Sequence, residues 1–180
     1  SQIEETEKMC DFVKNNYPKI NYLILNAGAT NRNSFNDLTI DEWNQVMNVN
    51  LTMPFFIVQN LTGCIVRGGR VIFIGAVMGI YPHAISIPYA VSKAGLHMLS
   101  KQLVKHMAPY EITVNVIAPG FVDTPWQKNK PLEQRKRIEN KIAVKRFALP
   151  EEVAKLCWDV SQNAYINGSV LEIDGGYCYE

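Results

Sequence analysis

Tyr89-Ala90-Val91-Ser92-Lys93 opens a helical run that continues to about Met107. The lysine lies four positions after the tyrosine, so the phenol and the ammonium lie one above the other on one helix face. A phenol titrates near pH ~10 and an ammonium near ~10.4, so neither alone carries protons well at neutral pH. A fixed positive charge favours phenolate and is expected to lower the pKa of Tyr89. The pair predicts a general acid or base acting on a carbonyl or alcohol oxygen. By itself, the spacing is more typical of a solvated helix face, and the sequence on both sides of it favours the chemical interpretation.

Length and composition limit which classes of protein the sequence can belong to. The chain has 180 residues, a formal net charge of +1 and 47% hydrophobic residues, which suits a single domain over residues 1–180. This balance does not indicate nucleic-acid or membrane partners, and no apolar run approaches the roughly 20 residues of a membrane span. The cysteines lie far apart without metal-ligand spacing, which predicts free buried thiols, a cytoplasmic protein and no metal site. They are Cys10, Cys64, Cys157 and Cys178.

Strand and helix signals alternate along the chain. A short apolar run typical of a strand buried on both faces occurs at residues 20–25, and a second buried strand is predicted at 70–75. Further strands are predicted at 113–118 and 169–173. Helix signals occur at 1–17, where Ser1 is a candidate cap, at 39–64 behind a capping box, at 88–107, and from Pro150 onward. The alternation predicts an α/β fold with a doubly wound, mostly parallel sheet covered on both faces.

Small and turn-forming residues follow three of the predicted strands. They are Asn26-Ala27-Gly28, Gly75-Ala76 and Pro119-Gly120. In parallel sheets of this kind, ligands bind outside the carboxyl ends of the strands. The three strand ends are therefore expected to meet at one crevice beside the helix that carries Tyr89 and Lys93.

Taken together, these motifs resemble the short-chain dehydrogenase/reductase family, and within it the 3-oxoacyl-carrier-protein reductase group. The residues that carry the resemblance are Leu25-Asn26-Ala27-Gly28, Asn48-Val49-Asn50-Leu51, Tyr89-x-x-x-Lys93, residues 114–120 running to Thr124, Tyr165-Ile166-Asn167-Gly168, and Asp174-Gly175-Gly176. The resemblance covers essentially the whole chain. It implies a Rossmann-like fold and a homotetramer or homodimer in which the helices at 39–64 and 88–107 pack against symmetry mates.

The resemblance also implies an NAD(P)-dependent oxidoreductase that interconverts a carbonyl and a secondary alcohol, with NAD or NADP as cofactor. Tyr89 would exchange the proton, while Lys93 would hold the nicotinamide ribose and lower the pKa of Tyr89. Asn50 would anchor a water linking Lys93 to solvent, or else make an ordinary polar contact within its helix. The further cofactor contacts implied are Asn26, Ala27 and Gly28 on the adenosine side, and Pro119, Gly120, Val122 and Thr124 at the nicotinamide carboxamide.

One departure from the family concerns a hydroxyl. The family places a serine thirteen residues before the tyrosine, where it hydrogen-bonds the reacting oxygen, but this chain has Ala76 there. Losing such a donor typically costs about 10²–10³ in rate. Ser86 is expected to belong to the start of the helix rather than to replace this hydroxyl. A naturally weak enzyme, an engineered variant and a loop gap that shifts the count remain alternative explanations.

A second departure concerns the beginning of the chain. The family opens with a strand, a glycine-rich turn and a helix that hold the cofactor pyrophosphate, whereas this sequence contains no G-x-x-x-G-x-G. No residue that would choose between NAD and NADP can be identified. The run at 20–25 is then expected to be an exposed apolar sheet edge, which favours aggregation. We therefore expect these 180 residues to be part of a longer protein.

Residues 122–148 correspond to the substrate lid of the family. They are rich in lysine and arginine, which predicts either an acidic substrate such as a phosphopantetheine or CoA derivative, or a solvated helix face. The basic residues are Lys128, Lys130, Arg135, Lys136, Arg137, Lys141, Lys145 and Arg146. The substrate pocket is expected to be lined by Ala76, Met78, Tyr81, Phe121 and Trp126, with Phe147 as a further candidate wall residue. Apart from Ala76, these residues are equally candidates for core or subunit contacts.

Two functions from different classes follow from these features. The retained Tyr89, Lys93 and Asn50 favour an oxidoreductase that Ala76 slows. Ala76 and the lack of a phosphate-binding turn favour a non-catalytic protein of the same fold with an assembly or binding role.

Overall fold

Four parallel strands form one sheet in the order β1-β2-β3-β4, which confirms the predicted α/β fold. The structure is a computed structural model that describes residues 2–82 and 86–179. The strands are β1 (Ile20–Leu25), β2 (Ile65–Ile74), β3 (Thr113–Pro119) and β4 (Val170–Ile173). β2 begins at Ile65 rather than at the predicted residue 70. Its first residue pairs with Ile20, and the register then shifts before Tyr22 pairs with Arg70, where Gly68 takes a positive φ of 77°.

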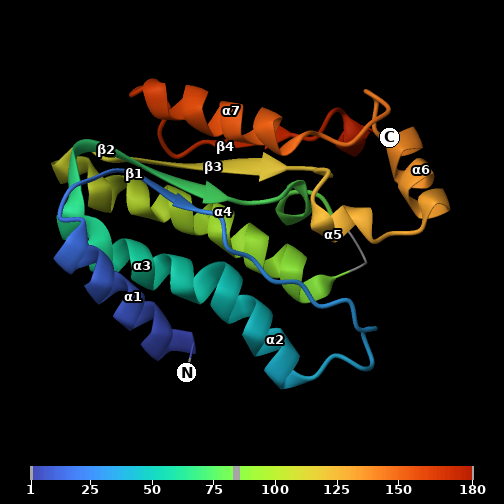
Figure 1. Cartoon of the computed structure of the whole chain (residues 1–180), viewed down its shortest axis with the longest axis horizontal. Coiled ribbons are helices and arrows are strands. Elements are labelled where there is room, and N and C mark those ends of the chain that lie inside the picture. The colour runs from blue at the N-terminus through green and yellow to red at the C-terminus, as the bar shows by residue number, and fades with distance from the viewer. Residues whose placement is uncertain (1, 83–85, 180) are drawn as a thin grey trace.

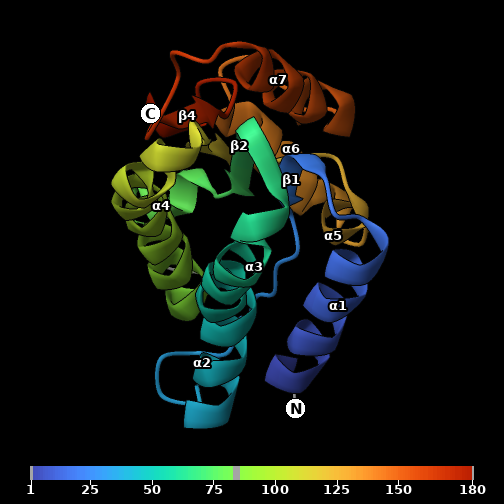
Figure 2. The same cartoon turned by 90° about the vertical axis from the view of Figure 1, so that its left-hand side faces the viewer.

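Helices cover both faces of the sheet. They are α1 (Gln2–Asn16), α2 (Ile40–Met47), α3 (Met53–Leu61), α4 (Ile87–Met107), α5 (Pro125–Lys128), α6 (Leu132–Lys141) and α7 (Pro150–Gln162). In Figures 1 and 2, α3 and α4 lie against one face with α1 beside α3, and α7 lies on the opposite face. Ser1, the candidate cap of α1, lies outside the described residues.

The helix predicted at 39–64 is interrupted. The predicted capping box at Thr39 starts α2, but a π-helical turn, η1 (Asn48–Thr52), separates α2 from α3. A π turn inserts one residue into the ladder and often occurs at a functional site. Here it contains Asn50, which is fully buried.

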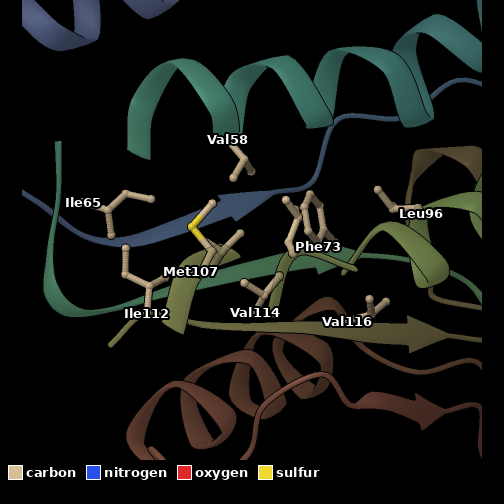
Figure 3. Packing of buried hydrophobic residues seen from close by; sticks show 10 residues of the cluster. Val58, Ile65, Phe73, Leu96, Met107, Ile112, Val114 and Val116 are labelled. Carbon is tan, nitrogen blue, oxygen red and sulfur yellow. The ribbon is translucent and has the colours of Figure 1, made fainter. Parts of the chain in front are cut away.

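The core follows the two-residue period of the strands. Val71 and Phe73 of β2 pack towards α3 and α4, together with Val114 and Val116 of β3, as Figure 3 shows for the labelled side chains. Ile72 packs in a second cluster on the side of α7. Burying one such side chain contributes roughly 1.5–3 kcal/mol, so both layers of helices are held to the sheet by apolar contact.

The prediction that β1 is buried on both faces is wrong. β1 pairs only with β2 in the described sheet, and Tyr22 and Ile24 are 45% and 49% exposed. The strand is apolar because its other side chains pack on the core, with Leu23 and Leu25 against the first cluster. The expected exposed apolar edge is therefore present.

None of the described helices has the length and apolar character needed to cross a lipid bilayer.

Candidate active site

Two cavities meet beyond the carboxyl ends of β2 and β3. The larger, of about 500 Å³, is lined by the ends of these strands, the start of α4 and the segment that forms α5 and α6; Figure 1 shows α5 and α6 beyond the arrowhead of β3. The smaller, of about 440 Å³, reaches Asn26 and Gly28 after β1 and Lys93 of α4. Tyr89, Gly75 and Thr124 line both. The expected convergence of strand ends is therefore found, with Tyr89 where the two cavities adjoin.

Tyr89 and Lys93 lie on the same face of α4, as their spacing predicts. The Nζ atom of Lys93 is 5.7 Å from the centroid of the Tyr89 ring and donates a hydrogen bond to the Ile74 carbonyl oxygen at 2.7 Å. Lys93 is only 3% exposed. One of its three N–H donors is thus used at the end of β2, and the ammonium is fixed beside the phenol.

The expected direction of the Tyr89 pKa shift is wrong for this structure. Burial raises the pKa of Tyr89 to about 12, and burial lowers the pKa of Lys93 to about 8. Both shifts have one physical cause, because removing a charged group from water costs more than removing its neutral form. Burial is thus the cause of both shifts, and the phenol keeps its proton at neutral pH.

Asn50 connects the turn after β1 to α4. Its Oδ1 accepts from the Ala29 N–H at 2.7 Å, and its Nδ2 donates to the Ala29 carbonyl and to Ser92 Oγ, each at 2.9 Å. A Cβ added to Gly28 would lie 3.5 Å from Asn50 Oδ1 and 3.8 Å from Lys93 Nζ. Asn50 thus makes contacts well beyond its own helix, whereas its role in a water relay stays a prediction.

Ala76 provides no hydroxyl to the larger cavity, although it lines that cavity. Its N–H donates to Nε2 of His97 at 3.4 Å. His97 is 6% exposed and lies four residues after Lys93 on α4, so it shares the face that carries Tyr89 and Lys93. Burial first, and then the charges of Lys93 and Lys101, lower the pKa of His97 to about 4. The neutral imidazole accordingly anchors the backbone at the Ala76 position.

Ser86 lines the larger cavity with Tyr89. Its hydroxyl donates to the Asn31 carbonyl and accepts from Thr30 Oγ1 at 3.2 Å. The proton of Ser86 is therefore used to tie the loop after β1 to the start of α4. This arrangement agrees with the expectation that Ser86 belongs to the start of the helix.

Most of the predicted site residues line one of the two cavities. From the predicted substrate pocket these are Ala76, Met78, Phe121 and Trp126, and from the predicted cofactor contacts Asn26, Gly28, Pro119, Gly120, Val122 and Thr124, with Tyr89 and Lys93. Ala27, Asn50 and Phe147 line neither.

Tyr81, a predicted pocket residue, lies outside both cavities, near Glu172 of β4. Burial first and then that carboxylate raise its pKa, and its contact with a substrate stays a prediction. The helical turn Val77–Gly79 after β2 redirects the chain before Tyr81 is reached, so residues adjacent in sequence face different surroundings. Phe147 packs instead behind the cavity, with its ring stacked at 5.8 Å from that of Phe121.

Several residues at or beside the cavities were not identified from the sequence. Thr30 and Arg32, from the loop after β1, line the larger cavity, and His97 accepts a hydrogen bond from the Ala76 N–H. The spacing of His97 from Lys93 gave a usable signal, since residues four apart share a helix face. Arg32 gave none, because its loop approaches Lys130 only in the folded chain.

Comparison with known proteins agrees with this geometry. The family model described as enoyl-(acyl carrier protein) reductase matches residues 1–178. The 3-oxoacyl-[acyl-carrier-protein] reductase FabG of Thermotoga maritima is 32% identical over 177 residues, covering 96% of this chain and 72% of that protein. The protein of the same name from Aquifex aeolicus is 33% identical, covering 96% and 71%.

Solved structures show the same likeness. A short-chain dehydrogenase/reductase from Serratia marcescens superposes with a TM-score of 0.89 at 28% identity, covering 96% of this chain and 71% of that one. A Pseudomonas aeruginosa RhlG/NADP active-site complex superposes with a TM-score of 0.88 at 30% identity, covering 96% and 72%. The parallel sheet and the tyrosine and lysine beside the strand ends agree with these similarities. The chain therefore belongs to the short-chain dehydrogenase/reductase family and is similar to its 3-oxoacyl-[acyl-carrier-protein] reductases.

Proposed function

We propose that this protein is an NAD(P)-dependent oxidoreductase that interconverts a carbonyl and a secondary alcohol, with Tyr89 as the acid/base. The observation that carries the proposal is the position of Tyr89 between two cavities, beside a buried lysine. A hydride-transfer site needs the cofactor and the substrate on two sides of one proton donor. The smaller cavity is suited to the cofactor and the larger one to the substrate.

The residues of the smaller cavity fit the nicotinamide ribose. One N–H of Lys93 Nζ donates to the Ile74 carbonyl oxygen. The other two N–H donors can bind hydroxyl acceptors. Gly28 lines the same cavity, and it has no side chain to fill the space near Nζ. A nicotinamide held by these residues would supply or accept the hydride. Thr124, which lines both cavities, and Val122, which lines the larger one, would hold its carboxamide end. Asn26 and Ala27 would lie on the adenosine side.

Tyr89 is suited to donate a proton when a carbonyl is reduced. Its pKa, raised to about 12 by burial, keeps the phenol protonated at neutral pH, so the hydroxyl hydrogen is available for the carbonyl oxygen. Lys93 assists as charge develops, because an ammonium beside a forming phenolate lowers the energy of that phenolate. In the reverse direction the same phenolate would accept the proton of the alcohol.

NADP is the first cofactor to test. A relative in the family, the Pseudomonas aeruginosa RhlG/NADP active-site complex, is described with this dinucleotide at 30% identity. That likeness supports nicotinamide binding in general, and NAD remains the second candidate. The carbonyl substrate is proposed to be a small molecule, and Ala76 is expected to make its turnover slow.

Fluorescence titration with NADPH and NADH tests the proposal. We expect binding below millimolar concentration, and slow oxidation of the bound nucleotide by ketones. Tyr89→Phe should keep nucleotide binding but lose about 10²–10⁴ in turnover, the usual contribution of a general acid. Lys93→Met should weaken both, whereas Lys105→Met, at an exposed position of the same helix, should change neither.

No fluorescence change at millimolar nucleotide would contradict the oxidoreductase proposal and favour the non-catalytic alternative. That alternative rests on Ala76, since a protein selected only for assembly has no need of the missing hydroxyl. Binding without any turnover by wild type or by Ala76→Ser would also favour it.

A further inference from the structure

Basic side chains gather on the wall of the larger cavity. Arg32 comes from the loop after β1, Lys130 from the connection between α5 and α6, and Arg137 from α6. Lys141 also lines the cavity. Among the described residues that line it, none is an aspartate or a glutamate. The charged side chains that line this wall are therefore all positive.

Arg32, Lys130 and Arg137 differ from two other arginines of residues 122–148, which are paired with carboxylates. Arg135 forms an ion pair with Asp123 at 3.0 Å, and Arg146 forms one with Glu152 at 2.7 Å. Within residues 2–82 and 86–179, no carboxylate lies within ion-pair distance of Arg32, Lys130 or Arg137. The charges of Arg32, Lys130 and Arg137 are thus not balanced by the protein's own carboxylates in the described part of the chain.

The like charges also lie close enough to affect one another. Burial lowers the pKa of Lys130 most, and the positive charges of Arg32 and Arg135 lower it further. Arg32 and Lys130 are far apart in the sequence, so the fold brings them together. Like charges held near one another raise the free energy of the folded protein, and an anion placed between them removes that cost.

A neutral polar group at the same wall also lacks a partner. The Oε1 atom of Gln127 is buried and, in the described structure, has no hydrogen-bond partner, and Gln127 lines the cavity. Buried polar atoms are normally hydrogen-bonded. A polar ligand that reaches this wall would supply the missing contact.

We propose that the substrate is a small carbonyl compound that carries its own anionic group, a carboxylate or a phosphate, held by Arg32, Lys130 and Arg137 while its carbonyl reaches Tyr89. The part of this proposal that concerns the carbonyl rests on the proposed function. A cavity of about 500 Å³ is in the usual range for small-molecule sites. Arginine suits both anions, because its planar donors match carboxylate and phosphate oxygens.

Calorimetric titration of the whole chain with matched probes tests the proposal. The carboxylate probes are 3-, 4- and 5-oxohexanoate, each compared with its neutral methyl ester, and the phosphate probe is dihydroxyacetone phosphate, compared with dihydroxyacetone. We expect at least one anion to bind about tenfold more tightly than its neutral counterpart, since charge-assisted hydrogen bonds are the stronger ones. Which pair shows the preference identifies the anion. Added salt should reduce it.

Three variants locate the effect. Lys130→Gln and Arg137→Gln should each remove most of the preference for the anion, without changing affinity for the neutral probe. Lys136→Gln removes a cation of α6 that lines neither cavity and should leave the preference intact. Equal affinity for every anion and its neutral counterpart, no detectable binding of any probe, or an equal loss in Lys136→Gln would overturn the proposal. Because these are binding measurements, a failure of NAD(P)H binding or oxidation would appear separately.

Discussion

Burial decides the protonation of Tyr89 and Lys93, the proposed catalytic pair. Tyr89 with a pKa of about 12 and Lys93 with a pKa of about 8 are both shifted towards their neutral forms. The helical spacing brings an ammonium to the phenol, but it says nothing about how far both groups are removed from water. The consequence is a phenol that holds its proton until an acceptor oxygen is placed against it.

Restoring the missing hydroxyl should accelerate the reaction. Ala76→Ser adds one donor at a position that lines the larger cavity, the proposed substrate site. One such donor contributes about 10²–10³ in rate where it reaches the reacting oxygen. We expect turnover in a NAD(P)H oxidation assay to rise by about tenfold or more. In a Tyr89→Phe background the same substitution should give little gain, because the proton donor is then absent. Unchanged turnover in the wild-type background would show that the substrate does not use this position.

His97 should make the protein less stable in acid. Its folded pKa is about 4, below the ordinary value of 6.5, so the unfolded chain binds more protons between these values. The free energy of unfolding should therefore have its full value above pH 6.5. It should fall as the pH is lowered towards 4, with a slope approaching about 1.4 kcal/mol per pH unit. Urea denaturation at several pH values measures it.

A pair of substitutions isolates the His97 contribution. His97→Leu should flatten this part of the pH profile, although it also leaves the Ala76 N–H without its acceptor. His106→Leu, at an exposed position near the end of α4, should leave the profile unchanged. An equal slope in wild type and His97→Leu would show that other groups cause the acid sensitivity.

The turn after β2 packs directly on α4. The helical turn Val77–Gly79 follows Ala76, and a Cβ added to Gly79 would lie 2.7 Å from the backbone N of Ala94 and 2.7 Å from the carbonyl carbon of Lys93. Only a glycine lets the two backbones approach this closely. The position of Ala76 at the cavity therefore depends on this contact between elements.

Gly79→Ala should consequently destabilise the protein and reduce its activity. Neither backbone can yield without moving the helix, and such overpacking costs about 1–3 kcal/mol. The matched control is Gly63→Ala, because no atom lies within 4 Å of an added Cβ there. Thermal unfolding of both variants tests the expectation, and an unchanged melting temperature for Gly79→Ala would refute the close packing of turn and helix.

The sheet as a whole is unequally protected. β3 is buried along its entire length, whereas β1 leaves Tyr22 and Ile24 about half exposed at an edge. Unpaired backbone groups on an apolar edge favour pairing with a second chain. This tendency is separate from the homotetramer or homodimer that the family resemblance implies, in which α2, α3 and α4 would meet their symmetry mates.

A charge on that edge should reduce self-association of the 180-residue chain. Ile24→Lys places an ammonium on β1, and charged edge residues oppose edge-to-edge pairing. We expect light scattering at high protein concentration to fall relative to wild type. Phe35→Lys, which replaces a side chain that is 82% exposed in a loop, serves as the control and should have little effect. If both substitutions lower scattering equally, exposed apolar area rather than the edge is responsible.

Local pattern was enough to predict most elements. Continuous apolar runs marked β1 and β3, the capping box marked the start of α2, and prolines marked the starts of α4 and α7. The early start of β2 was missed because residues 66–69 are not an apolar run, and the pairing ahead of them is the single contact of Ile65 with Ile20 of β1. The π turn at Asn50 was missed for a similar reason, since its contacts are with Ala29 and Ser92, distant in sequence.

By itself, the sequence determined the alternation of strands and helices, the family resemblance and the shared face of Tyr89 and Lys93, because periodicity and four-residue spacing are local properties. Only the tertiary structure decided the direction of the pKa shifts, the position of His97 beneath Ala76, and the meeting of Arg32 with Lys130. Desolvation and charge clustering depend on which distant segments fold against one another, and the local pattern of residues does not contain that information.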